Sequence, residues 1–380
     1  MRTVHPYRTL PAKAFWRRSV AALPMAEVDP VGRFDLRITP QSRVATAGSC
    51  FAQHIARHLS RTGFDYMVAE PGHPILPEVL RAAHGYGTFS ARYGNIYTSR
   101  QLRQLVDRSW DRFQPTEAPW LDSDGTVRDP FRPAVQPGNF ISVAEMEADR
   151  RQHLTAVRGM FETLDVFVFT LGLTECWISS EDGAVFPICP GVEGGTFDPA
   201  RYVFHNLTVE EVVADMQAVV DHLAAVNPSA QVVLTVSPVP LAATALPDGH
   251  VLTSTTYSKS VLRVAAQMLS DNNVAVHYFP SYEIITGSFN RGSYYADDLR
   301  NVLEEGVSHV MRLFLLHAAG ILPGTQVASN TVRSADGDEE WLERVAQFVE
   351  VECEEAFLED VDRDTPSAVF GTSPSSQRCD

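Results

Sequence analysis

Cysteine is scarce in this sequence, and no two cysteines lie close together. The 380 residues contain five cysteines, which are too widely spaced to form a Cys-x-x-Cys motif. This pattern favours neither a zinc site nor a disulfide framework, and we therefore expect no metal and no cofactor. The five are Cys50, Cys176, Cys189, Cys353 and Cys379.

Long apolar runs are missing as well. No segment has the roughly 18 consecutive apolar residues that are needed to cross a membrane. The N-terminal residues include several arginines but no apolar core of the kind found in signal peptides. These features predict a cytoplasmic protein without a membrane span.

Positive charge is low relative to negative charge. The net charge of −16 argues against a nucleic-acid-binding protein, which normally carries a basic surface. Residues 336–364 hold thirteen acidic residues against two arginines, so most of the excess lies near the C-terminus. We expect residues 323–380 to form an acidic helix followed by a disordered tail, which could bind an unknown protein partner.

One stretch joins a short β-prone segment to a helix through a tight turn. Residues 44–47 favour a strand, Gly48 and Ser49 favour a turn, and the next ten residues have apolar side chains at helical spacing. This layout lifts a serine hydroxyl to the carboxyl edge of a parallel sheet, beside helix N–H groups that favour negative charge. An ordinary structural turn is the alternative, and we expect Cys50 to be buried in the helix.

The five residues from Gly48 to Ala52 resemble the signature of the GSCFA family. That resemblance implies an SGNH-like (GDSL-like) hydrolase fold, with Ser49 at the position of the nucleophile. Other stretches that are similar to the family span most of residues 1–320: Tyr93-Gly94-Asn95-Ile96-Tyr97-Thr98, Thr170-Leu171-Gly172-Leu173-Thr174-Glu175, Val236-Ser237-Pro238-Val239-Pro240, Tyr257-Ser258-Lys259-Ser260 and Tyr278-Phe279-Pro280-Ser281-Tyr282-Glu283.

Strand and helix patterns alternate along the chain. After a Pro- and Arg-rich N-terminal arm (1–40), the main domain (41–322) contains further strand patterns at residues 64–68, 165–171, 231–236 and 274–279. Helices are predicted at 99–110, 208–226 and 256–269, and a capping-box pattern at 301–304 predicts the start of another. These elements predict an α/β fold: a parallel five-stranded sheet in a three-layer α/β/α sandwich.

Residues 70–150 interrupt this alternation with many prolines and glycines. A connection of that length is far longer than usual in a compact domain. Long insertions in α/β folds often cover the carboxyl edge of the sheet, so we interpret this one as a substrate-binding cap. A passive surface insertion is the alternative.

The residue that would activate the serine departs from the family pattern. The SGNH pattern supplies a base from an Asp-x-x-His motif after the last strand, but here Asp298 is followed by Asn301 in place of the histidine. Asparagine cannot accept a proton at neutral pH, whereas serine needs a neighbouring base. His205, which precedes a helix at the expected edge of the sheet, is therefore the predicted base, and we expect Asp298 to orient its ring or that of another histidine. The alternatives are His250 and His309.

The residues after the central strand are candidates for stabilising an oxyanion. The backbone N–H groups of Ser49 and Gly172 are the expected donors. Thr174 stands where the pattern has asparagine, and Glu175 would orient a base or a substrate hydroxyl. Alternatively, Glu175 is a buried carboxylate whose hydrogen bonds are satisfied by backbone N–H groups.

Together these features predict a serine esterase or O-acyltransferase of SGNH type. Its substrate would be an acyl ester of a carbohydrate or similar polyol, either a small molecule or a glycan, and transfer would prevail over hydrolysis if the cap excludes water. The alternative is a non-catalytic carbohydrate- or partner-binding protein that has kept the fold and lost the base.

Overall fold

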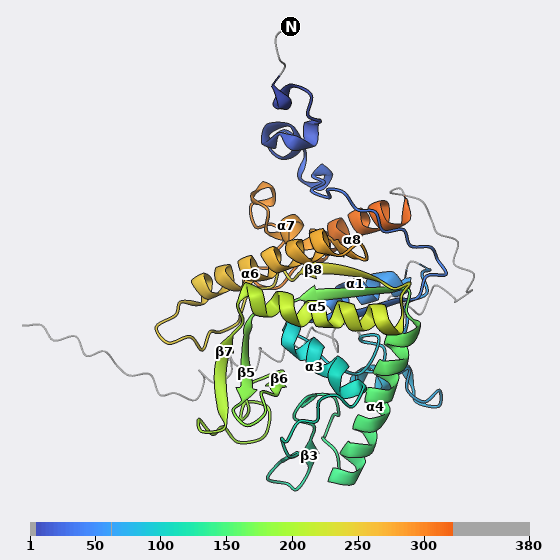
Figure 1. Cartoon of the computed structure of the whole chain (residues 1–380), viewed down its shortest axis with the longest axis vertical. Helices are drawn as coiled ribbons and strands as arrows, with labels where there is room; N and C mark the ends of the chain where they lie inside the picture. Colours follow the sequence, from blue (N-terminus) through green and yellow to red (C-terminus); the bar gives the residue numbers. More distant parts are fainter. Residues whose placement is uncertain (1–4, 62, 322–380) are drawn as a thin grey trace, which may run out of the picture.

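Four parallel strands form the centre of the molecule in a computed structural model that describes residues 5–61 and 63–321 (Figure 1). They are β1 (Val44–Gly48), β4 (Val166–Leu171), β8 (Gln231–Val236) and β9 (Val276–Tyr278), in the spatial order β1-β4-β8-β9. All three neighbouring pairs are parallel. The predicted α/β class and parallel sheet are confirmed.

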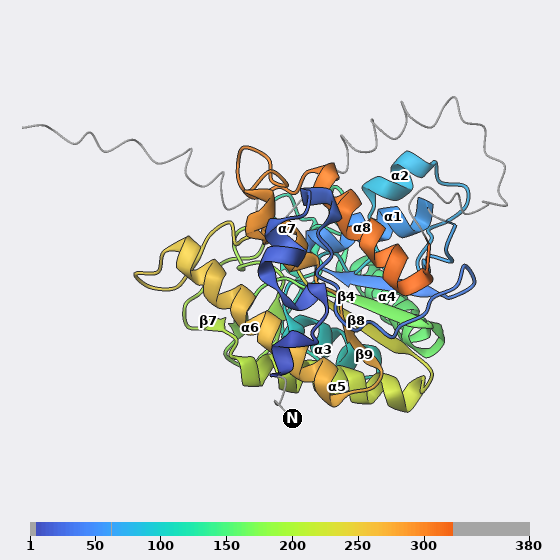
Figure 2. The ribbon, with the colours of Figure 1, turned by 90° about the horizontal axis from the view of Figure 1, so that it is seen from above.

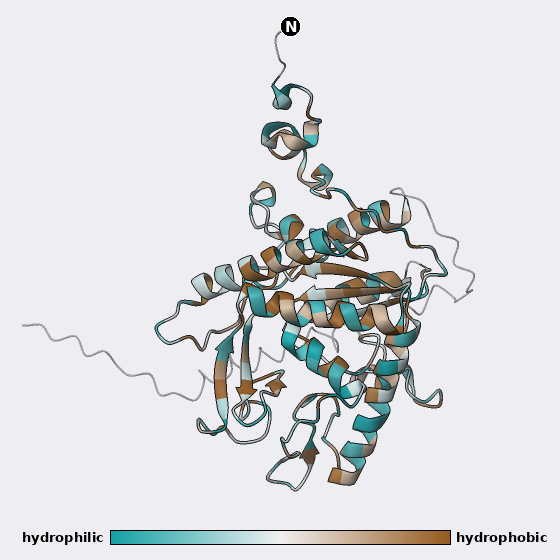
Figure 3. Ribbon diagram, viewed as in Figure 1, coloured by the Kyte–Doolittle hydropathy of each residue, from teal (hydrophilic) through white to brown (hydrophobic). Residues whose placement is uncertain are grey.

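The middle strand β4 is buried on both faces, which explains its unbroken apolar sequence. Phe167 and Phe169 enter one hydrophobic cluster. Val166 and Val168 point the opposite way, into a second cluster. Figure 3 accordingly shows the central strands as largely hydrophobic.

Helices cover both faces of this sheet (Figure 2). The layer over the first cluster consists of α3 (Ser99–Ser109), α4 (Val143–Thr163), α5 (Val209–Val226) and α6 (Val251–Asn272). The layer over the second cluster consists of α1 (Cys50–Arg61), α7 (Ser281–Thr286) and α8 (Glu304–Ala319). Among the described residues, no helix is both long and apolar enough for a membrane crossing.

The segment predicted as the second strand does not form one. Residues 64–68 lie beside β1 but make only one bridge, between Tyr66 and Val44. The chain then turns away, because the N–H of Ala69 donates to the carbonyl oxygen of Ser90 in the insertion. The central sheet therefore has four strands rather than the five expected.

The two predicted capping boxes have opposite outcomes. Thr208 and Glu211 form the reciprocal capping box at the start of α5, as predicted. The box predicted at residues 301–304 is wrong, since α8 begins at Glu304 with Leu303 as its N-cap and without a side-chain cap. The Asn301 side chain is engaged elsewhere, as described below.

Smaller elements surround the central sheet. A second, antiparallel sheet extends beyond β4 and has the order β6-β5-β7. Its strands are β5 (Glu175–Ser179), β6 (Val185–Phe186) and β7 (Tyr202–Asn206), and the insertion contributes α2 (Glu78–Ala83), β2 (Trp120–Leu121) and β3 (Val127–Arg128). Short helical turns are η1 (Pro6–Arg8), η2 (Ala12–Ala14), η3 (Arg17–Ala21), η4 (Met25–Glu27) and η5 (Ser288–Asn290).

The N-terminal segment lies along α8. The N–H of Ile38 donates to the carbonyl oxygen of Ala318, and Phe34 packs edge-on against Phe279 and Phe314. Residues of this segment thus belong to the second hydrophobic cluster. The predicted acidic helix and tail (323–380) lie outside the described residues.

Candidate functional site

The turn between β1 and α1 requires glycine at its first position. Gly48 has a φ of +138°, and a Cβ atom there would lie 2.4 Å from the carbonyl oxygen of Thr170 on β4. Only glycine permits both this backbone conformation and this close approach. Ser49 follows at the carboxyl edge of the sheet, and α1 begins at Cys50, which is buried.

The Ser49 hydroxyl is buried but unsatisfied. The residue is 3% exposed, and among the described residues its Oγ has no hydrogen-bond partner. The hydroxyl of Thr170, which is paired with Gly48 across the strands, is in the same state. A buried hydroxyl without a partner costs about 1–3 kcal/mol, so these two groups mark a place suited to a ligand or a reacting group.

Gly172 packs directly against Ser49. A Cβ atom on Gly172 would lie 3.0 Å from the Cβ of Ser49 and 2.9 Å from the carbonyl oxygen of Tyr97. The N–H groups of Gly172 and Leu173 both donate to that oxygen, at 3.0 and 2.9 Å. The end of β4 is therefore joined to the 93–98 stretch of the insertion.

Both backbone donors predicted for an oxyanion are engaged within the protein. The N–H of Ser49 donates to the carbonyl oxygen of Thr170 at 3.3 Å, and that of Gly172 donates to Tyr97. An oxyanion at this position would have to displace one of these carbonyl groups.

The other stretches that resemble the family converge on the same edge. The N–H of Ile96 donates to the carbonyl oxygen of Gly48 at 2.8 Å. The hydroxyl of Ser258 on α6 accepts the N–H of Thr174 at 3.0 Å. Segments that are far apart in the sequence are thus joined around Ser49 by direct hydrogen bonds.

Thr174 and Glu175 stabilise neighbouring loops. The buried Thr174 hydroxyl donates to Asn206 Oδ1 at 2.6 Å. The carboxylate of Glu175 accepts the Thr244 hydroxyl at 2.7 Å and the Ala245 N–H at 3.3 Å. Burial raises the pKa of Glu175, and these two hydrogen bonds oppose that rise.

The predicted base His205 lies on β7, opposite Cys176. Its Nε2 is 2.8 Å from Glu211 Oε1, the residue that also caps α5. The predicted orienting residue Asp298 lies in a different loop. Within the described part of the chain, no hydrogen bond therefore joins Ser49, His205 and Asp298 to one another.

The two alternative histidines have structural partners. His250 is the N-cap of α6, six residues before the predicted helix start at residue 256, and its Nδ1 accepts the N–H of Leu252. His309 lies between the Tyr294 hydroxyl at 2.7 Å and the Val28 carbonyl oxygen at 3.0 Å. Neither is hydrogen-bonded to Ser49 within the described part of the chain.

Asp298 and Asn301 form a pair of their own. The Asn301 Nδ2 donates to Asp298 Oδ2 at 2.6 Å. Their loop is joined to the end of β8, because the Tyr295 hydroxyl donates to the carbonyl oxygen of Pro238 at 2.8 Å. The loop thus lies by the carboxyl end of β8 and presents an amide in place of an imidazole.

Lys259 is a candidate site residue that sequence reasoning missed. It is 1% exposed, and its Nζ donates to the carbonyl oxygen of Gly172 at 2.6 Å. The signal was available in the sequence, since Lys259 stands three residues before Leu262 and seven before Ala266 on the buried stripe of α6. A lysine within such an apolar stripe is unusual.

No group of three or more His, Cys, Asp or Glu side chains in the described ranges is arranged to hold a metal ion. The groups that the structure places around Ser49 are Thr170, Gly172 and Lys259, together with backbone groups of the 93–98 stretch.

The fold and the site define an α/β protein with a buried serine on the turn between its first strand and first helix. The sequence profile of the GSCFA family matches residues 43–314. Because this match covers most of the chain, the protein belongs to the GSCFA family. No curated protein and no solved structure matches the chain.

Proposed function

We propose that this protein is a serine esterase or O-acyltransferase of the SGNH type, acting on an acyl ester of a carbohydrate or similar polyol. The observation that supports this proposal is the Ser49 hydroxyl, which is buried and has no hydrogen-bond partner among the described residues. A group kept in that state at the carboxyl edge of a parallel sheet is suited to attack a bound acyl carbonyl.

Lys259 is the base that we favour for this reaction. An amine takes the serine proton in Ser–Lys variants of the catalytic triad. The Nζ of Lys259 donates to the carbonyl oxygen of Gly172, which packs against Ser49, and the neutral amine would take the serine proton. His205 would need to leave Glu211 to serve the same purpose.

The reaction would proceed in two steps. The Ser49 oxygen adds to the acyl carbon while the base takes the hydroxyl proton, and the alcohol then leaves with that proton. The resulting acyl-serine is attacked by water in an esterase, or by a second alcohol in an acyltransferase.

A second candidate is a non-catalytic protein that binds a carbohydrate or another protein. The observation that favours it is the Asp298–Asn301 pair, in which an amide occupies the position of the expected imidazole. In this case the buried hydroxyls of Ser49 and Thr170 would bind the ligand through hydrogen bonds. A cytoplasmic location and a protein partner for the acidic tail remain predictions.

Labelling with a fluorophosphonate probe tests the proposal. The probe is expected to modify the full-length protein, and peptide mass spectrometry should locate the adduct on Ser49. A Cys50→Ala variant is the matched control, because it changes the adjacent buried residue and should still be labelled. An unlabelled wild-type protein that nevertheless binds an oligosaccharide would favour the second candidate.

A further inference from the structure

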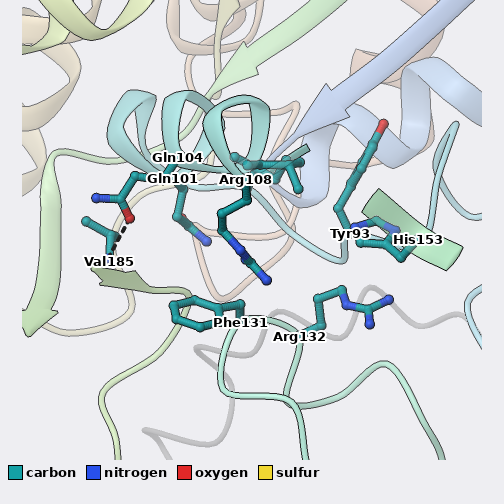
Figure 4. Close-up of a pocket in the computed structure, with 10 residues that line it drawn as sticks. Tyr93, Gln101, Gln104, Arg108, Phe131, Arg132, His153 and Val185 are labelled. Carbon is teal, nitrogen blue, oxygen red and sulfur yellow. Dashed lines mark hydrogen bonds between the residues drawn. The ribbon is translucent and has the colours of Figure 1, made fainter. Parts of the chain in front are cut away.

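A polar cavity lies between α3, α4 and the 131–132 stretch of the insertion (Figure 4). Its volume is about 30 Å³, which is room for about two water molecules or one small chemical group. The polar and aromatic side chains that matter for its chemistry are Gln101, Arg108, Phe131, Arg132 and His153.

Three nitrogen-bearing groups at this cavity have unmet hydrogen-bonding capacity. Arg132 Nη1 and His153 Nε2 are buried and have no partner among the described residues. The guanidinium of Arg108 lies 4.3 Å above the ring of Phe131. Within the described part of the chain, the Arg108 side chain has that ring contact but no hydrogen bond or ion pair. Figure 4 shows the Arg108 side chain extending from α3, with Phe131 on one side of it and Arg132 and His153 on the other.

The charges around the cavity do not balance. Ion pairs join Arg132 to Asp129 and Asp149, Arg150 to Asp129, Arg92 to Asp149, and His153 to Glu70. Three arginines therefore face three carboxylates, and Arg108 adds a fourth positive charge. Burial lowers the pKa of Arg108 to about 9, with the charges of Arg150 and Arg132 acting in the same direction and that of Asp129 against it.

Arg108 is partly buried, and withdrawing a cation from water is costly unless a counter-ion accompanies it. The described neighbours of Arg108 already use their carboxylates on other arginines. A negatively charged group that enters the cavity would supply the missing charge.

We propose that this cavity binds a carboxylate group, held by the guanidinium groups of Arg108 and Arg132. Guanidinium forks match the two oxygens of a carboxylate in plane, and the small volume suits a carboxylate better than a tetrahedral anion. The Gln101 amide is oriented for the same purpose, because its Oε1 accepts the N–H groups of Tyr97 and Thr98. That arrangement leaves the amide nitrogen directed toward the cavity (Figure 4).

The ring of His153 presents one of its two nitrogens to this cavity. Its Nδ1 lies 2.7 Å from Glu70 Oε2, so Nε2 is the ring nitrogen left for the cavity. In the neutral ring this atom accepts a hydrogen bond, for example from a water beside the carboxylate, and in the protonated ring it donates one.

Calorimetric titration of the full-length protein with sodium acetate tests the proposal, at constant ionic strength in a chloride-free buffer of a bulky anion. The wild-type protein should show saturable binding, and Arg108→Met should weaken it at least tenfold, as expected for the loss of a charge-assisted hydrogen bond. Arg151→Met is the matched control, because it removes one exposed arginine from α4 and should bind acetate like the wild type.

Three outcomes would overturn the proposal. They are no acetate binding to the wild-type protein, equal binding to the Arg108→Met and wild-type proteins, and tighter binding of phosphate than of acetate. Circular dichroism establishes that each variant is folded. If Arg108→Met does not fold, Arg108→Gln provides the same comparison with a polar side chain.

Discussion

The Lys259 ammonium lies 2.6 Å from the carbonyl oxygen of Gly172, the residue whose Cα packs against Ser49. A buried lysine and a serine with an unsatisfied hydroxyl thus both lie against one glycine. This relationship places an amine nitrogen near Ser49 that does not depend on the family's missing histidine.

Replacing the serine tests the first step of the proposed chemistry. Ser49→Ala should abolish cleavage of p-nitrophenyl acetate and labelling by the fluorophosphonate probe. Its melting temperature should stay within a few degrees of the wild type, because the lost hydroxyl has no described hydrogen-bond partner. Undiminished turnover would exclude Ser49 as the nucleophile, and Cys50→Ala would then be the next variant to measure.

Replacing Lys259 tests the proposed base. Lys259→Met should lower kcat by about 10²-fold or more, as expected for the loss of a general base. Lys259→Arg keeps the charge and the hydrogen bond to Gly172 but supplies no base at neutral pH, so its kcat should be equally low. Recovery of activity and of the wild-type pH profile by arginine would show a purely structural role.

His205 provides the comparison between the two candidate bases. Because Nε2 of His205 is held by Glu211, we expect His205→Ala to cost less activity than Lys259→Met. A loss of about 10³-fold in His205→Ala, with Lys259→Met active, would assign the base to the histidine instead.

Restoring the family motif tests the Asp298–Asn301 loop. Asn301→His should increase kcat/KM for the same ester by about tenfold or more if this loop faces Ser49, because Asp298 would then orient an imidazole. The double variant Asp298→Asn with Asn301→His is the control and should lose most of that gain. No gain in Asn301→His would place the loop outside the reacting site.

His153, which is buried beside the polar cavity, should make the stability of the protein depend on pH. Burial, reinforced by Arg132 and Arg108 and opposed by Glu70, lowers the pKa of His153 to about 4. The unfolded chain therefore takes up a proton near pH 6.5, before the folded protein does. The free energy of unfolding should fall as pH decreases from 7 to 5, by up to about 1.4 kcal/mol per pH unit from this residue.

Chemical denaturation at several pH values measures that slope. His153→Gln should flatten it, whereas His73→Gln, at an exposed position, should leave it unchanged. The charged groups around His153 are Glu70, Arg132 and Arg108, and the carboxylate titrates largely below this pH window. Equal slopes in the wild type and His153→Gln would contradict the assignment.

The elements that the sequence predicts well are those with strong local patterns. The apolar run of β4 and the Thr208–Glu211 capping box both have the expected structure, because burial on two faces and a reciprocal cap leave clear local signals. Residues 64–68 have the composition of a strand, but after Met67 the backbone hydrogen bonds go to the insertion instead of β1. Which segment this backbone pairs with depends on long-range contacts, and local composition does not predict those contacts.

The site residues also differ in whether a local sequence pattern identifies them. Ser49 and Gly172 were identified because their turns follow strands, and the structure places them in contact. Lys259 is 87 residues beyond Gly172 in the chain, and no local pattern connects the two. The polar cavity is still more difficult to predict from the sequence, because Arg108, Arg132 and His153 come from separate segments. Their excess of positive charge becomes visible only when the fold brings them together.

The N-terminal segment has a practical consequence for work on this protein. Phe34, Leu36 and Ile38 are buried in the cluster beneath α8, and the Arg37 side chain donates to the carbonyl oxygen of His317. A recombinant fragment that began at residue 43, where the match to the family begins, would expose this apolar surface to solvent. Exposed patches of that kind promote aggregation, so expression for crystallography or assays should retain the residues from Met25 onward.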